Sequence, residues 1–217
     1  MMHAAMPALC FARARPMPAV VPIDTSGLAE DVALALAQAL PFLRCGEESA
    51  VHAFGRRLMH SADPAEQLTL ANITADEQRH ANWLAALAAA LPTPHGGLDA
   101  EPSARFFRSL LTRDKALHFA RIAALDLAVC ALLHPLVAGG SVLASAPQVV
   151  DGLRSIRRDE ARHVRVARRC AKRLGWSASA QHTLDRTMRD ELAALLAPVR
   201  VSLLRLGIVD FGVAVHA

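Results

Sequence analysis

The sequence predicts an all-α fold, a helical bundle, from three observations. Of the 217 residues, 53% are hydrophobic and 20% are charged, which is enough apolar material for the core of one domain. Alanine and leucine dominate, whereas aromatic residues make up only 4% and Tyr is absent, a composition that favours helices over strands. Apolar residues also recur at steps of three and four along the chain, as they do on one face of a helix.

The N-terminal third is expected to hold an arm and two helices. Residues 1–27 contain four prolines and are predicted to form a flexible arm. Apolar periodicity predicts a first helix from residue 28 to His60, kinked or restarted near Pro41. Asp63 followed by proline is a helix start signal, so a second helix is expected to run to Leu91.

A long crossover and a third helix follow. Residues 92–112 carry Pro, Gly and Asp, with a short helical patch around Phe106 to Leu111, and are predicted to cross from one side of the bundle to the other. Helical periodicity resumes at about Arg113 and continues to Leu136, before a Gly-Gly pair. This segment is the expected third helix.

Two more helices complete the bundle domain, which is predicted to span residues 28–206. The fourth should run from about Pro147 to Leu174, with Ser145 as N-cap and Gly175 as C-cap. The fifth, residues 179–206, contains a proline and is expected to bend. Residues 207–217 are expected to form a C-terminal tail.

One motif occurs twice, as Asp76-Glu77-Gln78-Arg79-His80 in the second helix and Asp159-Glu160-Ala161-Arg162-His163 in the fourth. The spacing of three places Glu and His one turn apart on one helix face, where both can bind one metal ion. A single such pair is common on solvated helices. Here each pair interrupts an apolar stripe, and charged residues facing a core must be paired or coordinate metal. A metal site and a buried ion-pair network both remain open on this evidence.

The other two long helices each offer one carboxylate on a stripe that is otherwise apolar. In the first helix, Glu47 lies on the stripe of Leu36, Leu40, Leu43 and Phe54, whereas the row through Glu48 contains Cys45 and His52. In the third helix, Asp126 is the only acid between Asp114 and Asp151. Glu47 and Asp126 are therefore the expected additional ligands.

The complete set, Glu47, Glu77-x-x-His80, Asp126 and Glu160-x-x-His163, resembles the ferritin-like di-iron carboxylate superfamily. The resemblance implies a four-helix bundle with a long crossover between the second and third helices and, in this chain, an additional C-terminal helix. It also implies that Glu77 and Glu160 bridge two ions, with Glu47 and His80 completing one and Asp126 and His163 the other. Asp126 departs from the glutamate usual at this position.

The ions implied are two irons, with manganese or a mixed Mn/Fe pair as alternatives, because oxygen and imidazole ligands suit both metals. Asp76 and Asp159 are expected to orient the histidine of the opposite motif, or to cap a helix or pair with an Arg. A substrate cavity is expected beside the metals, and the residues predicted to wall it are Phe54, Leu84, Phe119, Ile122 and Cys130.

The function expected from this resemblance is activation of dioxygen by a non-haem di-iron centre to oxidise or oxygenate a small organic substrate. The absence of Tyr excludes a tyrosyl-radical subunit of ribonucleotide reductase, and the absence of Cys-x-x-Cys excludes the rubredoxin half of a rubrerythrin. Electrons would come from an external donor or reductase, since the sequence has no flavin or nucleotide motif. The alternatives are a rubrerythrin-like peroxidase or ferroxidase, and a non-catalytic interaction module with buried ion pairs.

Net charge and cysteine usage limit the partners and the cellular compartment that we expect. Setting the four ligand carboxylates against two divalent ions leaves 16 acids against 24 Lys and Arg, which weighs against iron storage. A cluster of basic residues in the fourth helix most simply forms its solvated face and could also attract an anionic substrate or partner; its members are Arg157, Arg158, Arg165, Arg168, Arg169, Lys172 and Arg173. We expect no nucleic-acid partner, no membrane span and a cytoplasmic location with reduced thiols. A homodimer is common in this superfamily, but the sequence does not indicate which surface would form its interface.

Overall fold

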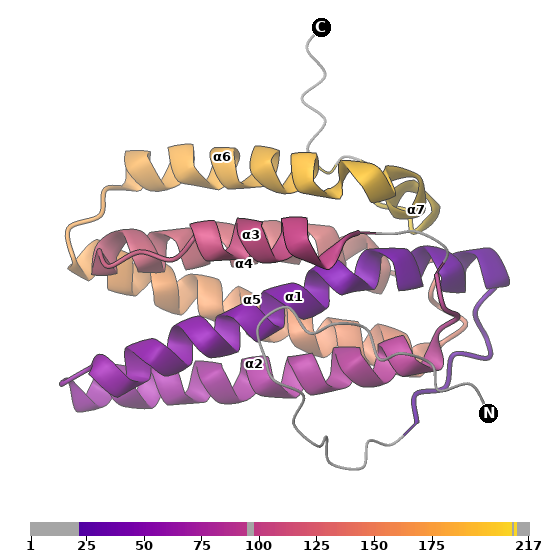
Figure 1. The fold of residues 1–217 in the computed structure, drawn as a ribbon, viewed down its shortest axis with the longest axis horizontal. Coiled ribbons are helices and arrows are strands. Elements are labelled where there is room, and N and C mark those ends of the chain that lie inside the picture. Colours follow the sequence, from indigo (N-terminus) through magenta and orange to yellow (C-terminus); the bar gives the residue numbers. More distant parts are fainter. Residues whose placement is uncertain (1–21, 95–97, 210, 212–217) are drawn as a thin grey trace, which may run out of the picture.

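The computed structural model describes residues 22–94, 98–209 and 211, and every regular element within them is helical, which confirms the all-α prediction (Figure 1). The elements in order are α1 (Glu30–His60), α2 (Pro64–Ala90), α3 (Ala100–Ser109), α4 (Lys115–Val137), α5 (Pro147–Arg173), α6 (Ala178–Leu196), the short 3₁₀ helix η1 (Ala197–Val199) and α7 (Arg200–Arg205).

The long helices pack as two pairs, α1 with α2 and α4 with α5. A three-residue connection turns the chain back between α1 and α2, so these two helices are antiparallel. In Figure 1, α6 lies along α4 on the side away from α2, and α3 packs on α1 and also contacts α6. Five helices contribute fully buried leucines to the core, namely Leu36, Leu84, Leu133, Leu153 and Leu192.

Local sequence signals place most of the helix ends. The side chain of Asp63 accepts a hydrogen bond from the Ala65 backbone at the start of α2, as an N-cap does. Gly175, just after α5, has a φ of 90°, a conformation that favours glycine. Ser145 was wrongly predicted to be the N-cap of α5. The N-cap is Ala146, which makes no side-chain cap, and the proline that follows has no N–H to satisfy.

Two prolines act differently inside predicted helices. The helix around Pro41 is not restarted, because α1 is continuous from Glu30 to His60, and Figure 1 shows that it changes direction along its length. The predicted fifth helix is instead divided into α6, η1 and α7, with Pro198 inside η1.

The crossover holds more structure than the sequence indicated. The expected patch around Phe106 to Leu111 is a ten-residue helix, α3, that begins six residues earlier and packs on α1. The aromatic rings explain its position. Phe107 is 2% exposed, stacks on Phe42 of α1 at a centroid distance of 5.6 Å and meets Phe106 edge-on at 5.2 Å.

Part of the predicted arm is ordered. The backbone N–H of Asp24 donates to the side chain of Gln148 at 2.9 Å, the hydroxyl of Thr25 donates to the carbonyl of Ala90 at 3.0 Å, and Ile23 is buried. Residues 22–27 are therefore fixed on the bundle rather than loose, because they hydrogen-bond to the last carbonyl of α2 and to a side chain in the first turn of α5. Residues 1–21 of the arm, and residues 210 and 212–217 of the tail, lie outside the described residues.

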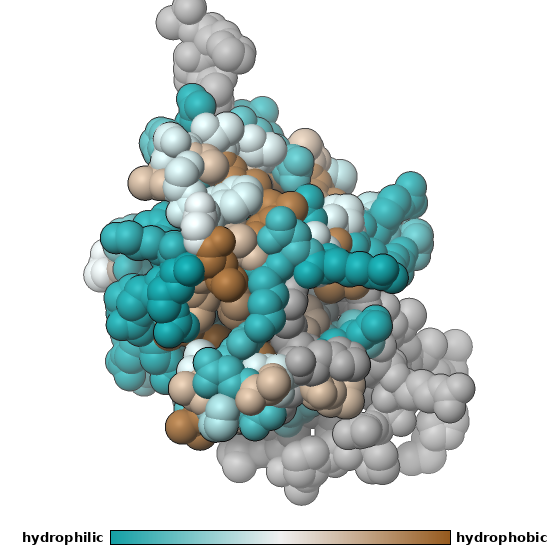
Figure 2. Space-filling model, turned by 90° about the vertical axis from the view of Figure 1, so that its left-hand side faces the viewer, coloured by the Kyte–Doolittle hydropathy of each residue, from teal (hydrophilic) through white to brown (hydrophobic). Residues whose placement is uncertain are grey.

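One described helix, α4, is long and apolar enough to cross a membrane, which the sequence analysis did not anticipate. In its most apolar window, 50% is buried inside the structure, as in the core helix of a bundle, and the window contains the buried acid Asp126. Figure 2 shows one end of the molecule, where hydrophilic residues cover most of the described surface and apolar residues appear as smaller patches among them.

A close helix contact yields a test of this packing. A Cβ placed on Gly152 of α5 would overlap the indole ring of Trp83 on α2, whereas a Cβ on Gly55 of α1 would meet nothing within 4 Å. We expect Gly152→Ala to lower the free energy of unfolding by about 1–3 kcal/mol through overpacking. The matched change Gly55→Ala should raise it by up to about 1 kcal/mol, because alanine favours a helix over glycine. Urea unfolding followed by circular dichroism measures both, and equal effects would contradict this α2–α5 contact.

Candidate metal centre

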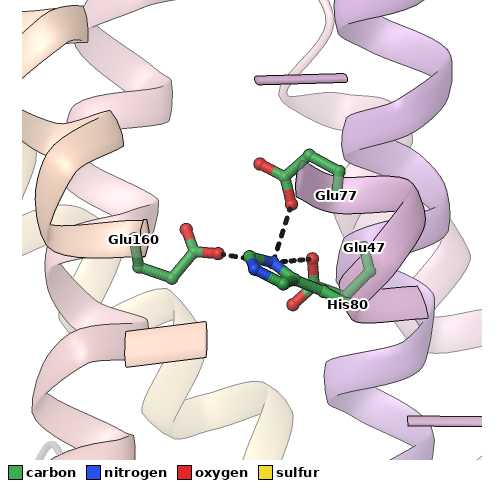
Figure 3. Close-up of side chains that lie close together, drawn as sticks. All are labelled: Glu47, Glu77, His80 and Glu160. Atoms are coloured by element: carbon green, nitrogen blue, oxygen red, sulfur yellow. Dashed lines mark hydrogen bonds and ion pairs between the residues drawn. The ribbon is translucent and has the colours of Figure 1, made fainter. Parts of the chain in front are cut away.

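The six predicted ligands meet in the middle of the bundle. Each of the four long helices contributes, and the residues are Glu47 from α1, Glu77 and His80 from α2, Asp126 from α4, and Glu160 and His163 from α5. None is more than 9% exposed. Figure 3 shows three of the glutamates arranged around His80.

Glu77 and Glu160 each reach both histidines with separate oxygens. The two oxygens of Glu77 lie 3.7 Å from Nδ1 of His80 and 3.1 Å from Nδ1 of His163. Those of Glu160 lie 3.3 Å and 3.5 Å from the same two nitrogens. Each carboxylate therefore spans two positions, one beside each imidazole, as a bridging ligand must.

The remaining carboxylates divide between the two positions. Oε2 of Glu47 lies 3.3 Å from Nδ1 of His80. On the other side, Asp126 groups with Glu160 and His163. Within the group of Glu47, Glu77, His80 and Glu160, and within the group of Asp126, Glu160 and His163, the candidate ligand atoms lie within 4.8 Å of one another.

Three buried atoms test whether this set fits metal ions. Oδ2 of Asp126 is buried without a hydrogen-bond partner in the described structure, while Oε1 of Glu160 and Nδ1 of His163 have only ion-pair contacts, with His80 and Glu77 respectively, and no well-aligned hydrogen bond. Buried polar atoms without a hydrogen bond are costly, and all three belong to the predicted ligand set. Oxygen and imidazole donors at each position suit iron, manganese or zinc. We conclude that each of the two groups could hold a metal ion.

The two aspartates of the repeated motif cross over between the helices. Oδ2 of Asp159 lies 3.2 Å from Nε2 of His80, and Oδ2 of Asp76 lies 3.3 Å from Nε2 of His163. Each imidazole thus has its outer nitrogen on the opposite motif's aspartate and its inner nitrogen toward the centre. A carboxylate at Nε2 selects the tautomer whose Nδ1 lone pair is available to a metal.

The arginines of the motif pair with these aspartates. From the sequence, pairing with an Arg was only an alternative role for the aspartates. Arg79 pairs with Asp76 at 2.8 Å and with Asp159 at 2.9 Å, and Arg162 pairs with both of the same acids. The presence of Arg at the same place in both copies of the motif was the sequence feature that could have indicated this role. The guanidinium groups reach the surface, with side-chain exposures of 56% and 47%.

Burial and pairing perturb the acid–base properties of the centre. Burial, followed by the charge of Glu77, raises the pKa of Glu47 well above its usual range. Burial, with Glu160 and Glu77 nearby, does the same to the pKa of Asp126. Burial alone would lower the pKa of His163, but its contacts with the carboxylates of Glu160 and Glu77 outweigh this effect and raise the pKa to about 11. In the metal-free centre, protons therefore occupy groups that a metal ion would need deprotonated.

Two small cavities adjoin the centre between α1, α3 and α4. The outer one, of about 50 Å³, has Phe54 and Ile122 among its walls, together with Leu110 and Leu111 from the end of α3. The inner one, of about 40 Å³, reaches Glu47, Glu77, Asp126 and Glu160. Gly46 and Phe107 line both. Because a water needs roughly 10–15 Å³, each cavity has room for a few waters or one molecule of dioxygen size.

Three predicted cavity residues do not line these spaces. Leu84 lies in the main core at 0% exposure, and Phe119 packs in a separate apolar cluster with Ala167 and Cys170. The Sγ of Cys130 instead lies 3.6 Å from the carbonyl of Arg157. The sequence analysis also missed the wall formed by α3, for which the pair Phe106-Phe107 in a polar connection was the only signal.

The choice between neighbouring glutamates on α1 is testable. Glu47 faces the centre, whereas Glu48 lies 3.9 Å from Arg44 at the helix edge. We expect Glu47→Ala to lower the metal content of the purified protein and Glu48→Ala to leave it unchanged. Elemental analysis after dialysis measures both variants. Loss of metal from the Glu48 variant alone would mean that the helix faces the other way.

Metal uptake should also depend on pH. With the pKa of His163 raised to about 11, its imidazole is protonated at pH 7, and a metal ion must displace that proton. We expect proton release on metal binding and an apparent affinity that weakens as the pH falls from 8 to 6. Calorimetric titration in two buffers of different ionisation enthalpy counts the protons. Uptake without proton release would contradict the protonated resting state.

Comparison with known proteins found no match for this chain. The chain matches no family model, no curated protein and no solved structure. What stands is an all-helical structure with a buried group of Glu, His and Asp residues that could hold metal ions.

Proposed function

We propose that this protein is a non-haem di-iron protein of the ferritin-like carboxylate type that activates dioxygen to oxidise a small organic substrate. The observation that carries the proposal is the reach of Glu77 and Glu160, each of which spans both histidines with its two oxygens. An isolated ion-pair network needs no such double span, because one oxygen per pair would suffice.

The chain's own residues have separable tasks in this reading. Glu47 and His80 would complete one metal position, and Asp126 and His163 the other. Asp76 and Asp159 hold the imidazoles by their outer nitrogens and keep the inner lone pairs directed to the centre. The two arginines fix the aspartates in turn. Two bound ferrous ions would supply two electrons for the reduction of dioxygen, which an external donor must replace.

The cavities support access from the α1/α3/α4 side. The outer cavity is walled mainly by apolar side chains, including Phe54, Leu110 and Ile122, and it shares Gly46 and Phe107 with the inner one. Apolar walls suit dioxygen and a small apolar substrate, and they keep water from the reacting centre. A bulkier substrate would require α3 to move.

The small cavity volume favours a second candidate, peroxide reduction or ferroxidase activity without an organic substrate. Spaces of about 50 and 40 Å³ accept dioxygen or peroxide without rearrangement, whereas an organic molecule needs more room. Consumption of peroxide by the iron-loaded protein, in the absence of any organic molecule, would favour this candidate.

Metal loading tests the proposal directly. After anaerobic loading with ferrous iron, we expect about two irons per chain and a transient optical band on exposure to oxygen. Glu77→Ala and Glu160→Ala should each abolish the paired site, because each bridge serves both positions. Glu48→Ala is the matched control and should retain the iron.

A lack of metal binding would contradict the proposal. Failure to bind iron or manganese after loading, in protein that remains folded by circular dichroism, would overturn the proposal. The centre would then be a buried ion-pair network, and the chain a structural or interaction module.

A further inference from the structure

The exposed face of α5 carries a stripe of basic residues that the metal centre does not use. Arg158, Arg165, Arg169 and Lys172 are exposed, and none of them forms an ion pair within the described part of the chain. Their spacing places them on one helix face, and the 14 steps from Arg158 to Lys172 cover about 21 Å at 1.5 Å per residue. We call these four residues the α5 basic stripe.

Acidic residues do little to cancel this stripe. Asp159 faces the seam with α2, where it is 14% exposed and already pairs with Arg79 and Arg162. Asp151 pairs with Arg154, one turn before the stripe begins. Asp185 of α6 pairs with Arg168, which lies to one side. The stripe therefore presents a positive field to solvent, suited to an acidic partner.

The stripe also adjoins a short polar connection from the surface to the centre. Arg162 lies between Arg158 and Arg165 in the helical sequence, is 47% exposed and pairs with Asp76. Asp76 lies 3.3 Å from the outer nitrogen of His163, a proposed ligand. Arg79 and Asp159 make the same connection to His80. Two polar contacts thus join the surface to each imidazole.

The cavities lie on another side of the centre, among α1, α3 and α4. An electron donor seated over α5 would leave that side open to dioxygen and substrate. Nucleic acid and anionic lipid also carry negative charge. Neither of them supplies electrons, so neither accounts for a polar connection that ends on the proposed metal ligands.

We propose that the α5 basic stripe docks an acidic electron-carrier protein, and that electrons enter the centre through the Arg–Asp–His connections between α2 and α5. The inference rests on the proposed di-iron function. In each encounter the reduced carrier loses one electron and one ferric ion becomes ferrous, so two encounters restore the ferrous pair and no bond of the chain is broken.

The first test measures electron entry with small donors of opposite charge. The oxidised, iron-loaded protein is reduced in a stopped-flow instrument by a reduced anthraquinone disulfonate, which is anionic, or by a viologen radical, which is cationic. In Arg165→Glu/Arg169→Glu we expect the ratio of the anionic to the cationic rate constant to fall about tenfold at low ionic strength. The difference should disappear near 1 M salt, where charges are screened within about 3 Å.

A charge-matched variant on another helix is the control. Arg186 and Arg189 are exposed residues of α6, so Arg186→Glu/Arg189→Glu changes the net charge equally. This variant should change the ratio by less than about twofold. Equal effects in the two variants, or no effect in the α5 variant, would overturn the proposal by showing that electrons enter elsewhere.

The second test measures docking without relying on iron. Binding of an acidic [2Fe–2S] ferredoxin to the purified protein, as isolated, is followed by calorimetry at low salt. Charge reversal on α5 should weaken binding at least tenfold, and reversal on α6 should not. Stripe-dependent binding of duplex DNA or of phosphatidylserine vesicles that exceeds binding of the ferredoxin would overturn the choice of partner. Because this test needs no iron, docking can succeed or fail independently of the di-iron function.

Discussion

Six ionisable side chains share the centre of the bundle, and the rest of the structure depends on how their charge is balanced. An isolated charge in an apolar interior is too costly to persist, so each must meet a partner, a proton or a metal ion. In this protein the balance is made across helices, because each imidazole lies between carboxylates from its own helix and from its neighbours. The centre therefore ties the α1/α2 pair to the α4/α5 pair.

The repeated motif explains how two helices serve one centre. In each copy the Glu and the His face inward, while the Asp and the Arg lie toward the seam between α2 and α5. The Asp of one helix then meets the His of the other, and both arginines meet both aspartates. Four charged residues thus form a bridged layer between the buried ligands and solvent, which sets the imidazole orientation from outside.

The centre has two dissimilar sides. Toward α3, apolar side chains enclose small cavities that reach four of the six proposed ligands. Toward solvent at α2 and α5, charged residues connect the imidazoles with a basic surface. The proposed function, which takes in an apolar molecule and receives electrons from a separate protein, would use both kinds of surface. The separation follows from the fold, because the crossover helix covers only one side of the four long helices.

The sequence by itself determined the helical class, the positions of the long helices and the identity of the six candidate ligands. These depend on local periodicity, and a polar residue on an apolar stripe, as at Asp126, is visible without coordinates. Tertiary structure alone decided the ring contacts that place α3, the residues that wall the cavities and the anchoring of residues 22–27. It also decided between the alternatives left open for the two aspartates, each of which contacts the opposite histidine and pairs with both arginines. The reason is physical: spacing within a helix fixes which residues share a face, whereas contacts between segments distant in sequence depend on how helices pack, and no local pattern encodes that.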